Sequence, residues 1–544
     1  MKQVDQIPTA ESLLSQGWNF LKNKQNNQAI EISQLLNKFY PNLGVAWYFT
    51  GKVALTINNI LAAKQSFKNA CKLTPAKQPW KITLANVYYR LNEIEPLKKL
   101  ITSLDLSMLS ATEHNQIAML YSQIHLYQQS IEHYHKAIAL EPEKSTHYYS
   151  LAAVQRYAGD LEQAEINLTK AIEFHPFDID AHTLRVDLKK QTKEDNYIES
   201  LTALINQPVL PKPLSVKDKV QLYYALAKSY EDIAEHDKSF ECLQKGASLR
   251  RQHIDYHINQ DTDTMTEISR YFDQNWWANV PSARQKEQEK LTPIFILGMP
   301  RTGSTLIDQI LSAGKEVQGA GELNDFSRLL TEQVKNTFGN DIKTKQEFIE
   351  ASARIDFHQL GADYLSSVHA QFSHLGVGNK VHCFTDKLPF NFLYIGLIQK
   401  ALPNAKIIHV TRGAMDTCYA VFKTLFQQAY PFSYDQKELA QYFASYQKLM
   451  AHWQKLPQLN IHTINYEQLV ERPEDTAEEL YQFCDLNWRA EYTNVQNNNS
   501  AVTTASASQI RQPIHKGSVQ KWRKYHQQLA PLIQQLEQEG ISCD

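Results

Sequence analysis

Hydrophobic and polar positions follow two different patterns along the chain. Up to about residue 253, apolar side chains recur at helical spacing between regularly placed prolines. After residue 290, short runs rich in β-branched residues alternate with helical patterns. The first pattern is typical of packed helix pairs, and the second of parallel strands joined by helices. We therefore expect an all-α N-terminal part and an α/β C-terminal part.

The prolines of the first part mark a repeat. The interval from Pro41 to Pro75 is the same as the interval from Pro142 to Pro176. Counting back from three of these prolines finds large and small side chains in matching positions. They are Trp47, Gly51, Ala63, Phe67 and Ala70 before Pro75, Ala118, Tyr121, Tyr134 and Ala137 before Pro142, and Tyr148, Leu151, Ala152, Ala164, Leu168 and Ala171 before Pro176. Small residues let two helices approach closely, while large ones fill the groove between them.

The interval and the pattern resemble the tetratricopeptide repeat, whose period is about 34 residues. Weaker copies fit 10–43, 77–110 and 220–253, and a more divergent helical pair fits 179–212. The resemblance covers about residues 9–253 and implies a solenoid with a concave face for a peptide or protein partner. Repeats that only support the second half of the chain are the alternative, and the sequence leaves it open.

The composition changes after Ser269. An aromatic patch with Trp276 and Trp277 precedes a charged stretch and then the apolar residues 293–297. We expect these tryptophans to pack between the solenoid and the next domain rather than to form a ligand shelf. The expected organisation is a solenoid at 9–253, a connecting segment at 254–290 and a second domain at 291–544.

Four short runs in the second domain predict parallel strands. They lie at 294–297, 381–385, 406–411 and 461–465. Each run is followed by polar groups, which are the glycine loop, Asp386 with Lys387, Arg412, and Tyr466 with Glu467. Ligands bind at the carboxyl ends of the strands in an open parallel sheet. We therefore expect these groups to converge on one crevice.

Composition and charge narrow the class of protein. Lys and Arg number 56 against 58 for Asp and Glu, and the net charge of -2 gives no reason to expect nucleic acid or an acidic membrane as a partner. The six cysteines lack CxxC spacing and fit reduced thiols in a cytosol. No stretch approaches the ~20 apolar residues that span a bilayer. We expect a cytoplasmic protein without a membrane span.

The segment GMPRTGST, residues 298–305, has the glycine spacing of a phosphate-binding loop. Ser304 stands where a nucleoside triphosphatase has its lysine, so a triphosphate with its metal is not expected. Backbone amides and the N-terminus of the next helix would hold one phosphate, and Arg301 would bind two anionic oxygens. The loop therefore fits a single phosphate at the end of a nucleotide.

Six motifs occur in order between about residues 291 and 540. They are PRTGST, GAGEL, TDKLPFNF, PNAKIIHVTRGAMDT, NYEQLVERPE and SASQIRQPIHKGSVQKW. With them the domain resembles the sulfotransferases, most of all the tyrosylprotein sulfotransferases and bacterial sulfotransferases fused to tetratricopeptide repeats. The resemblance implies a P-loop-like α/β fold with a parallel sheet flanked by helices. It also implies 3′-phosphoadenosine 5′-phosphosulfate as the sulfate donor, a hydroxyl acceptor and no metal.

The resemblance assigns roles to individual residues. Glu322 is implied as the base that takes the acceptor proton, Lys387 as the cation that stabilises the leaving oxygen, and Ser506 as a contact to the transferring group. The residues implied to bind the donor are Pro300, Arg301, Thr302, Gly303, Ser304, Thr305, Arg412, Tyr466, Gln509, Ser518 and Lys521.

One position departs from the family's pattern. Ala420 stands where the family places a serine on the 3′-phosphate of the donor, which removes one hydrogen bond unless Thr417 or Thr424 supplies it. Two further residues are interpreted as core residues. His409 lies mid-strand and is expected to be hydrogen-bonded rather than to act as a base, and Trp522 is expected to pack.

The acceptor and the activity have alternatives at this point. The acceptor hydroxyl belongs to protein tyrosine, to a carbohydrate or to a small molecule. A repeat scaffold whose second domain binds a nucleotide but has lost catalysis is a different class of protein, and Ala420 would be the trace of that loss. An ordinary P-loop kinase is disfavoured by Ser304.

Overall fold

The computed structural model describes residues 8–206, 213–283, 291–339, 341–373, 381–426, 429–497 and 513–543. The chain forms two compact units. The first comprises residues 1–154 with 370–375, and the second comprises residues 155–369 with 376–544. The division near Val154 falls within the helical region. The boundaries expected near residues 254 and 290 stay predictions.

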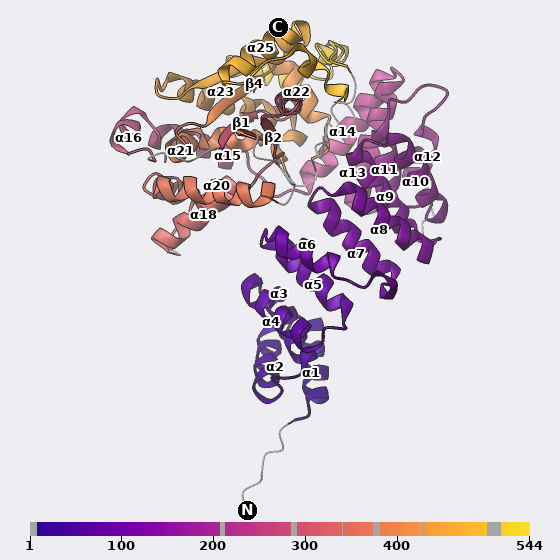
Figure 1. Cartoon of the computed structure of the whole chain (residues 1–544). Coiled ribbons are helices and arrows are strands. Elements are labelled where there is room, and N and C mark those ends of the chain that lie inside the picture. The colour runs from indigo at the N-terminus through magenta and orange to yellow at the C-terminus, as the bar shows by residue number, and fades with distance from the viewer. Residues whose placement is uncertain are drawn as a thin grey trace, which may run out of the picture. The chain divides into compact units, whose positions relative to one another are not determined.

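Helices follow one another in pairs from Ala10 to Gln252 (Figure 1). The described helices of this region are α1 (Ala10–Lys22), α2 (Asn26–Phe39), α3 (Gly44–Thr56), α4 (Ile60–Leu73), α5 (Gln78–Arg90), α6 (Ile94–Thr102), α7 (Ala111–Gln123), α8 (Tyr127–Leu140), α9 (Ser145–Ala158), α10 (Leu161–Phe174), α11 (Ile179–Leu188), α12 (Ile198–Asn206), α13 (Val216–Asp232) and α14 (His236–Gln252). The expected all-α solenoid is confirmed.

The repeat period is visible in the backbone as well as in the side chains. The turn inside successive helix pairs places one residue in the left-handed region, at Lys24, Asn58, Asn92, His125 and Gly159, which follow one another at nearly equal intervals. A helix end commonly uses this conformation to satisfy its last carbonyl groups. The repeat therefore fixes the same turn each time, although only one of these five positions is glycine.

Close helix contact explains the small residues of the repeat. A Cβ atom at Gly51 of α3 would lie 2.6 Å from the ring of Phe67 in α4. Phe67 is completely buried, and so is Ala63 one turn earlier in α4. A larger residue at position 51 would push the two helices apart.

The second unit continues with further helices around a sheet. They are α15 (Asn259–Tyr271), α16 (Gln274–Asn279), α17 (Ser304–Ser312), α18 (Asp325–Phe338), α19 (Lys345–Ser352), α20 (Phe357–Ser373), α21 (Ile395–Ala401), α22 (Ala414–Phe422), α23 (Gln436–Lys455), α24 (Tyr466–Glu471), α25 (Pro473–Phe483) and α26 (Ala530–Gln538). In α16, Trp276 is buried against Phe272 and Phe357, with ring centroids 4.8 and 6.0 Å away. This tryptophan is a packing residue.

The sheet has five parallel strands in the order β2-β3-β1-β4-β5. Their bounds are β1 (Thr292–Gly298), β2 (Val317–Gly319), β3 (Cys383–Asp386), β4 (Lys406–Thr411) and β5 (Ile461–Asn465). The expected α/β fold is confirmed, and β2 is the strand that sequence analysis missed. The chain crosses from the β3 side of β1 to the β4 side, which makes the end of β1 a switch point where ligands commonly bind.

Helices cover both faces of the sheet. Ile294 and Ile296 of β1 belong to a buried cluster with Ile307 of α17 and Leu480 of α25. Phe295 points to the opposite face, where its ring packs against Phe326 of α18 and Tyr364 of α20 at centroid distances of 6.3 and 5.7 Å. A strand that is apolar on both sides is expected in a parallel sheet covered on both faces.

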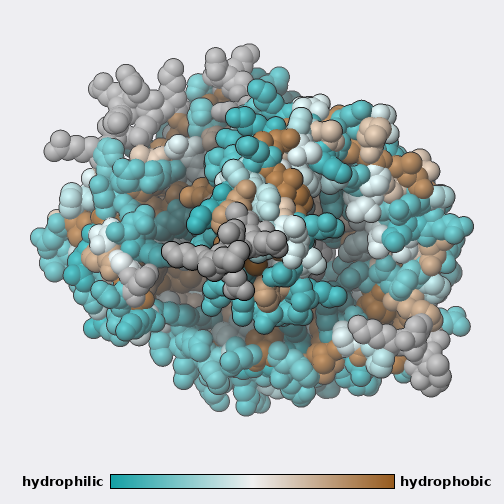
Figure 2. All heavy atoms as spheres, turned by 90° about the horizontal axis from the view of Figure 1, so that it is seen from below, coloured by the Kyte–Doolittle hydropathy of each residue, from teal (hydrophilic) through white to brown (hydrophobic). Residues whose placement is uncertain are grey.

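Within the described residues, no helix is both long enough and apolar enough for a membrane span. On the face shown in Figure 2, hydrophobic residues form small, separated patches among hydrophilic ones.

Candidate active site

The glycine loop joins β1 to α17 and depends on three left-handed residues. They are Gly298 (φ 142°), Arg301 (φ 67°) and Gly303 (φ 101°). A Cβ atom at Gly298 would lie 2.5 Å from the carbonyl oxygen of Val410, so the loop passes very close to β4. The hydroxyl of Thr302 donates a hydrogen bond of 2.8 Å to the Met299 carbonyl and closes the turn.

Gly303 is the residue immediately before α17, where the backbone favours an anion site. The helix begins at Ser304, and the Gly303 carbonyl accepts from the amides of Leu306 and Ile307 at 2.9 and 3.2 Å. The amides at the start of a helix point toward its N-terminal end. These amides and the helix dipole favour a negative group at this end. The hydroxyl-bearing residues Ser304 and Thr305 lie in the first turn.

A cavity of about 630 Å³ opens at the glycine loop, entirely within the second unit. This volume suits a nucleotide-sized ligand. Eight of the residues predicted to bind the donor line it, which are Arg301, Gly303, Ser304, Thr305, Arg412, Tyr466, Ser518 and Lys521. Pro300 and Thr302 do not line it. Ser506 and Gln509 lie outside the described residues.

Arg412, directly after β4, connects three segments of the cavity wall. Its Nη1 donates to the Arg301 carbonyl at 3.2 Å, and its Nη2 donates to the Ser518 carbonyl at 2.6 Å. Its guanidinium lies 4.8 Å from the centroid of the Tyr466 ring. The Nε atom is buried and has no hydrogen-bond partner among the described residues. Arg412 and Arg301 thus share one cavity.

The hydroxyls of Tyr466 and Ser518 complete this part of the wall. They form a hydrogen bond of 2.7 Å with each other, which joins α24, the helix after β5, to the C-terminal segment. Burial and the nearby Arg412 guanidinium lower the pKa of Arg301 to about 10. Arg301 still carries its charge at neutral pH. The second guanidinium at this end of the cavity has a carboxylate partner, because Asp416 lies 3.7 Å from Arg412 Nη2.

Glu322 and Lys387 lie on the loops that follow β2 and β3. Their side chains form an ion pair, in which the Lys387 side chain is 2% exposed and the Glu322 side chain 44%. The Lys387 amide also donates to the Gly321 carbonyl at 2.8 Å. Neither residue lines the 630 Å³ cavity. Both stand at the same carboxyl edge of the sheet as the glycine loop, because β3 pairs directly with β1.

Asp308 connects this ion pair to the helix after the glycine loop. It lies in α17 and accepts a hydrogen bond from the hydroxyl of Thr385 in β3. Burial raises the pKa of Asp308, while the charge of Lys387 opposes that rise. Asp308 was not predicted from sequence, because an acid within an apolar helical segment has no motif of its own.

The hydroxyl groups expected to replace the missing serine are engaged elsewhere. Ala420 lines the cavity. The Thr417 hydroxyl donates to the Arg412 carbonyl at 3.2 Å, and the Thr424 hydroxyl donates to the Ala420 carbonyl at 2.8 Å. Neither threonine lines the cavity, so the idea that one of them takes over from a serine at position 420 is wrong for this conformation.

His409 and Trp522, which were interpreted as core residues from the sequence, are both buried. His409 is buried in β4, bonds to the hydroxyl of Tyr446 through Nε2, and has its pKa lowered to about 4 by burial. Trp522 is buried at 5% exposure and packs against His526. Neither side chain is aimed at the cavity as a reactive group.

Sequence reasoning missed the residues that the helical region adds to this cavity. They are Asp187, Leu188, Lys189, Lys190, Lys228, Glu231, Asp232 and His236, and they come from α11, α13, α14 and the segment after α11. The only sequence signal was the pair of lysines that follows α11 in the divergent part of the repeat array. That signal does not distinguish a cavity wall from a solvated surface.

Comparison with known proteins gives matches for both the sheet-containing domain and the helical repeats. Residues 293–490 match the sulfotransferase family, and residues 220–253 match the tetratricopeptide repeat. An uncharacterized protein of Aquifex aeolicus is 30% identical over 388 residues, which are 70% of this chain and 49% of that protein. The match therefore spans about half the length of that relative.

More distant relatives carry functional names. The protein-tyrosine sulfotransferase of Drosophila melanogaster is 22% identical over 250 residues, which are 42% of this chain and 46% of that protein. Protein-tyrosine sulfotransferase A of Caenorhabditis elegans is 22% identical over 235 residues, with coverages of 42% and 60%. A tetratricopeptide repeat protein of Parabacteroides merdae is 15% identical in structure-based comparison, covers 44% of this chain and 92% of its own, and has a TM-score of 0.33. This chain therefore contains a sulfotransferase family domain at residues 293–490 and a tetratricopeptide repeat at residues 220–253.

Proposed function

We propose that the protein transfers a sulfuryl group from 3′-phosphoadenosine 5′-phosphosulfate to a hydroxyl group, and that the acceptor is a tyrosine side chain of a peptide or protein. The observation that carries this proposal is the cavity at the glycine loop. Arg301 and Arg412 line it together, the loop lacks the lysine of a triphosphatase, and the family match covers the loop and both arginines.

The residues present fit a nucleotide with an anionic end. The first amides of α17 and the Arg301 guanidinium are suited to the oxygens of the phosphosulfate. The Tyr466 ring is held against the Arg412 guanidinium, whose Nη atoms bind the Arg301 and Ser518 carbonyl groups. When bound, the donor supplies an activated sulfuryl group. The role of this chain is to bind, orient and move a proton.

Glu322 and Lys387 are the residues that we assign to chemistry. The Glu322 carboxylate would accept the proton of the acceptor hydroxyl, and Lys387 would offset negative charge that develops on the leaving phosphate oxygen. Their ion pair holds both groups at the edge of the sheet where the glycine loop begins. Because Lys387 is almost fully buried, its charge acts with little screening by solvent.

Aromatic side chains near Glu322 support a phenolic acceptor. Burial and the Glu322 carboxylate both raise the pKa of Tyr430. Phe390 and Phe426 pack against Tyr430 with centroids 4.7 and 4.6 Å away, and both are only partly buried. A partly exposed aromatic surface next to a carboxylate suits the ring of a tyrosine. The relatives named as protein-tyrosine sulfotransferases support the same acceptor.

The proposal is tested by transfer of labelled sulfate. The full chain is incubated with the ³⁵S-labelled donor and with tyrosine peptides, the same peptides with phenylalanine in place of tyrosine, and oligosaccharides. Label on the tyrosine peptides alone is the expected result. Label on the oligosaccharides alone would make the tyrosine assignment wrong. Binding of adenosine 3′,5′-bisphosphate without any transfer would favour the second candidate, a nucleotide-binding repeat scaffold, for which Ala420 in the cavity wall is the relevant observation.

A further inference from the structure

The helical region contributes a wall to the cavity at the glycine loop, and that wall carries lysines. Lys189 and Lys190 follow α11, and Lys228 lies in α13. Lys423, which follows α22, and Lys521 and Lys524 of the C-terminal segment line the same cavity. Clustered cations at a cavity wall need acidic partners or an anionic ligand. The partners of each lysine therefore decide which of them is available.

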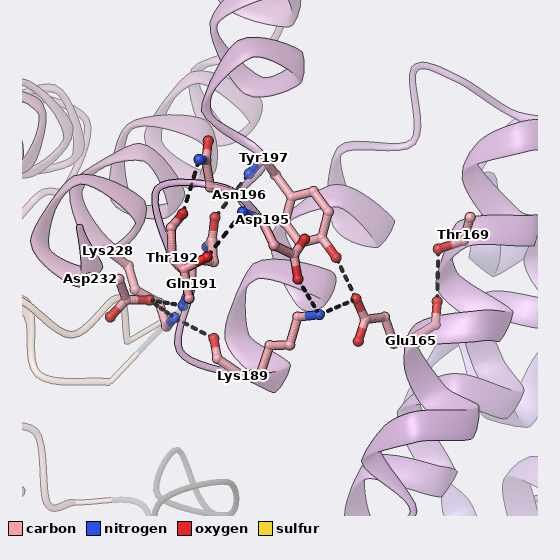
Figure 3. A network of polar contacts seen from close by, with 10 residues as sticks. All are labelled: Glu165, Thr169, Lys189, Gln191, Thr192, Asp195, Asn196, Tyr197, Lys228 and Asp232. Carbon is pink, nitrogen blue, oxygen red and sulfur yellow. Dashed lines mark hydrogen bonds and ion pairs between the residues drawn. The ribbon is translucent and has the colours of Figure 1, made fainter.

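Lys189 and Lys228 are held by carboxylates. Lys189 Nζ lies 2.8 Å from Glu165 and 2.9 Å from Asp195, and Lys228 Nζ lies 2.7 Å from Asp232 (Figure 3). Lys228 also donates to the Lys189 carbonyl at 3.0 Å. These two lysines are structural, because their charges are matched within the helical region.

The same network fixes the backbone on both sides of Lys190. The Gln191 amide donates to Asp232 at 3.0 Å, and its side-chain amide donates to the Ser229 hydroxyl at 2.9 Å (Figure 3 shows Gln191 beside Asp232 and Lys228). With the Lys189 carbonyl held by Lys228, the neighbours of Lys190 are tied to α13 on either side. Lys190 is thus presented on a rigid support, which lowers the entropy lost when it binds a ligand.

Lys190 itself has no acidic partner. In the part of the chain that the structure describes, its ammonium makes no hydrogen bond and no ion pair, and the same holds for Lys521 and Lys524. Partial burial and the charges of Lys423, Lys190 and Lys524 lower the pKa of Lys521, and only Glu231 opposes them. Glu231 is already bound at 2.9 Å by Lys423. Lys423 therefore already binds the carboxylate that acts on Lys521.

The lysine cluster formed by Lys190, Lys423, Lys521 and Lys524 lines the same cavity as Arg301 and Arg412 at the glycine loop. The charged groups that act on Arg301 are Arg412 and Asp187, whereas those that act on Lys521 are the other lysines and Glu231. The cavity therefore contains positive charge both at the glycine loop and at the lysine cluster. A ligand with anionic groups at two positions matches this arrangement better than a ligand with one.

We propose that Lys190, on the helical-repeat part of the chain, binds the second phosphate of the sulfate donor together with Lys521, so that the repeats complete the nucleotide site. This inference rests on the proposed function, because it takes the donor to be a nucleotide with a separate 3′-phosphate. It supplies a donor group at a phosphate for which Ala420 offers none. It also gives the repeats a role inside the site, in addition to the predicted binding of a partner.

The test compares two ligands and two variants of the full chain by calorimetry. The ligands are adenosine 3′,5′-bisphosphate and adenosine 5′-phosphate, which lacks the second phosphate. The variants are Lys190→Ala and, as a matched control, Lys193→Ala, an exposed lysine of the same segment that does not line the cavity. Loss of a charged hydrogen bond is expected to weaken bisphosphate binding about tenfold or more in Lys190→Ala. Binding of the monophosphate by this variant, and of both ligands by Lys193→Ala, should change less than about twofold, since neither loses a contact.

The outcomes separate this inference from the proposed function. If the unmodified protein binds the bisphosphate no better than the monophosphate, the donor assignment and this inference both fail. If it prefers the bisphosphate and Lys190→Ala retains that preference, only the assignment of Lys190 fails. An equal loss for both ligands would also overturn it, because the lysine would then not act at the second phosphate. Because Lys190 is exposed to the cavity, unfolding of the variant is not expected, and its thermal unfolding is measured alongside.

Discussion

Lys387 shows how the fold turns an ordinary surface residue into a candidate catalytic group. At 1% exposure its charge is almost fully removed from water, and its ammonium contacts the half-exposed Glu322 carboxylate. A buried cation without an anion would be costly, so the pair is structurally necessary in the absence of a ligand. It also keeps the carboxylate of Glu322 at a fixed place at the edge of the sheet.

The role of Glu322 is tested by the change Glu322→Gln. We expect turnover to fall by roughly 100-fold or more, the usual contribution of a general base, while binding of adenosine 3′,5′-bisphosphate is retained. The measurements are initial rates of sulfate transfer and calorimetry. Glu332→Gln is the control, because Glu332 is an exposed acid of nearby α18 that pairs with Arg328. Equal rates for Glu322→Gln and the unmodified protein would remove Glu322 from the mechanism.

Asp386, the residue before Lys387, predicts a dependence of stability on pH. Burial raises its pKa to about 7, although a hydrogen bond of 2.7 Å from the Tyr364 hydroxyl opposes the rise. The folded chain keeps this proton up to about pH 7, whereas an unfolded chain releases it near pH 4. Raising the pH from 4 to 7 therefore lowers the free energy of unfolding through this group.

The variant Asp386→Asn removes this titration and replaces one carboxyl oxygen with an amide nitrogen of similar size. Unfolding is followed at pH 4.5, 5.5 and 7. Relative to the unmodified protein, the variant should gain stability as the pH rises. A stability difference that stays constant over this range would show that the carboxyl of Asp386 does not hold its proton in the folded protein.

At the scale of the element, the glycine loop and α17 act as one unit. The left-handed conformation of Arg301 is uncommon for a residue with a side chain and is stabilised by its surroundings, because Arg412 donates to its carbonyl. The loop ends at Gly303, and Ser304 and Thr305 in the first turn of α17 line the cavity. The proposed anion site therefore depends on the local backbone conformation as well as on side chains.

Gly303→Ala tests this element directly. The new Cβ would lie 2.5 Å from the Tyr466 ring, and the position has φ 101°, which alanine rarely adopts. The strain, on the order of 1–3 kcal/mol, should displace the loop or the ring and weaken bisphosphate binding about tenfold or more. Calorimetry measures the affinity. An unchanged affinity would mean that neither the turn nor the position of Tyr466 matters to the nucleotide.

At the scale of the whole molecule, the candidate site belongs to the second compact unit. All residues that line the cavity lie at position 187 or later, and they come from the helical region, the sheet and the C-terminal segment. The repeat helices α11, α13 and α14 are therefore parts of the site, whereas α1–α6 belong to the first unit. Partner binding by the concave face of the repeats stays a prediction.

Hydrogen exchange can detect this organisation. Bound adenosine 3′,5′-bisphosphate should slow amide exchange in α13, α17 and α22, because a ligand stabilises the elements that it contacts. Exchange in α1–α6 should remain the same within error. Protection that reaches α1–α6 would show that the two units respond to the nucleotide together, and an absence of protection in α13 would remove the helical region from the site. Mass spectrometry of peptic fragments gives the measurement.

The sequence by itself determined the two architectures and most of the individual groups at the strand ends. A constant repeat period and short apolar runs followed by Arg412, Lys387 or the glycine loop are local patterns, and local patterns record which faces of an element are buried. The motifs then indicated the sulfotransferase domain that the comparison found at residues 293–490. The very short strand β2 was not found, because so short a run carries no periodicity.

Only the tertiary structure decided which distant groups share the cavity. Lys190 and Lys521 are far apart in the sequence, yet they lie in the same lysine cluster. Whether Thr424 bonds to a carbonyl or to a ligand, and whether Lys190 faces solvent or a site, depends on how helices pack against one another. Packing brings together residues whose spacing along the chain contains no regularity, so no pattern in the sequence could report it.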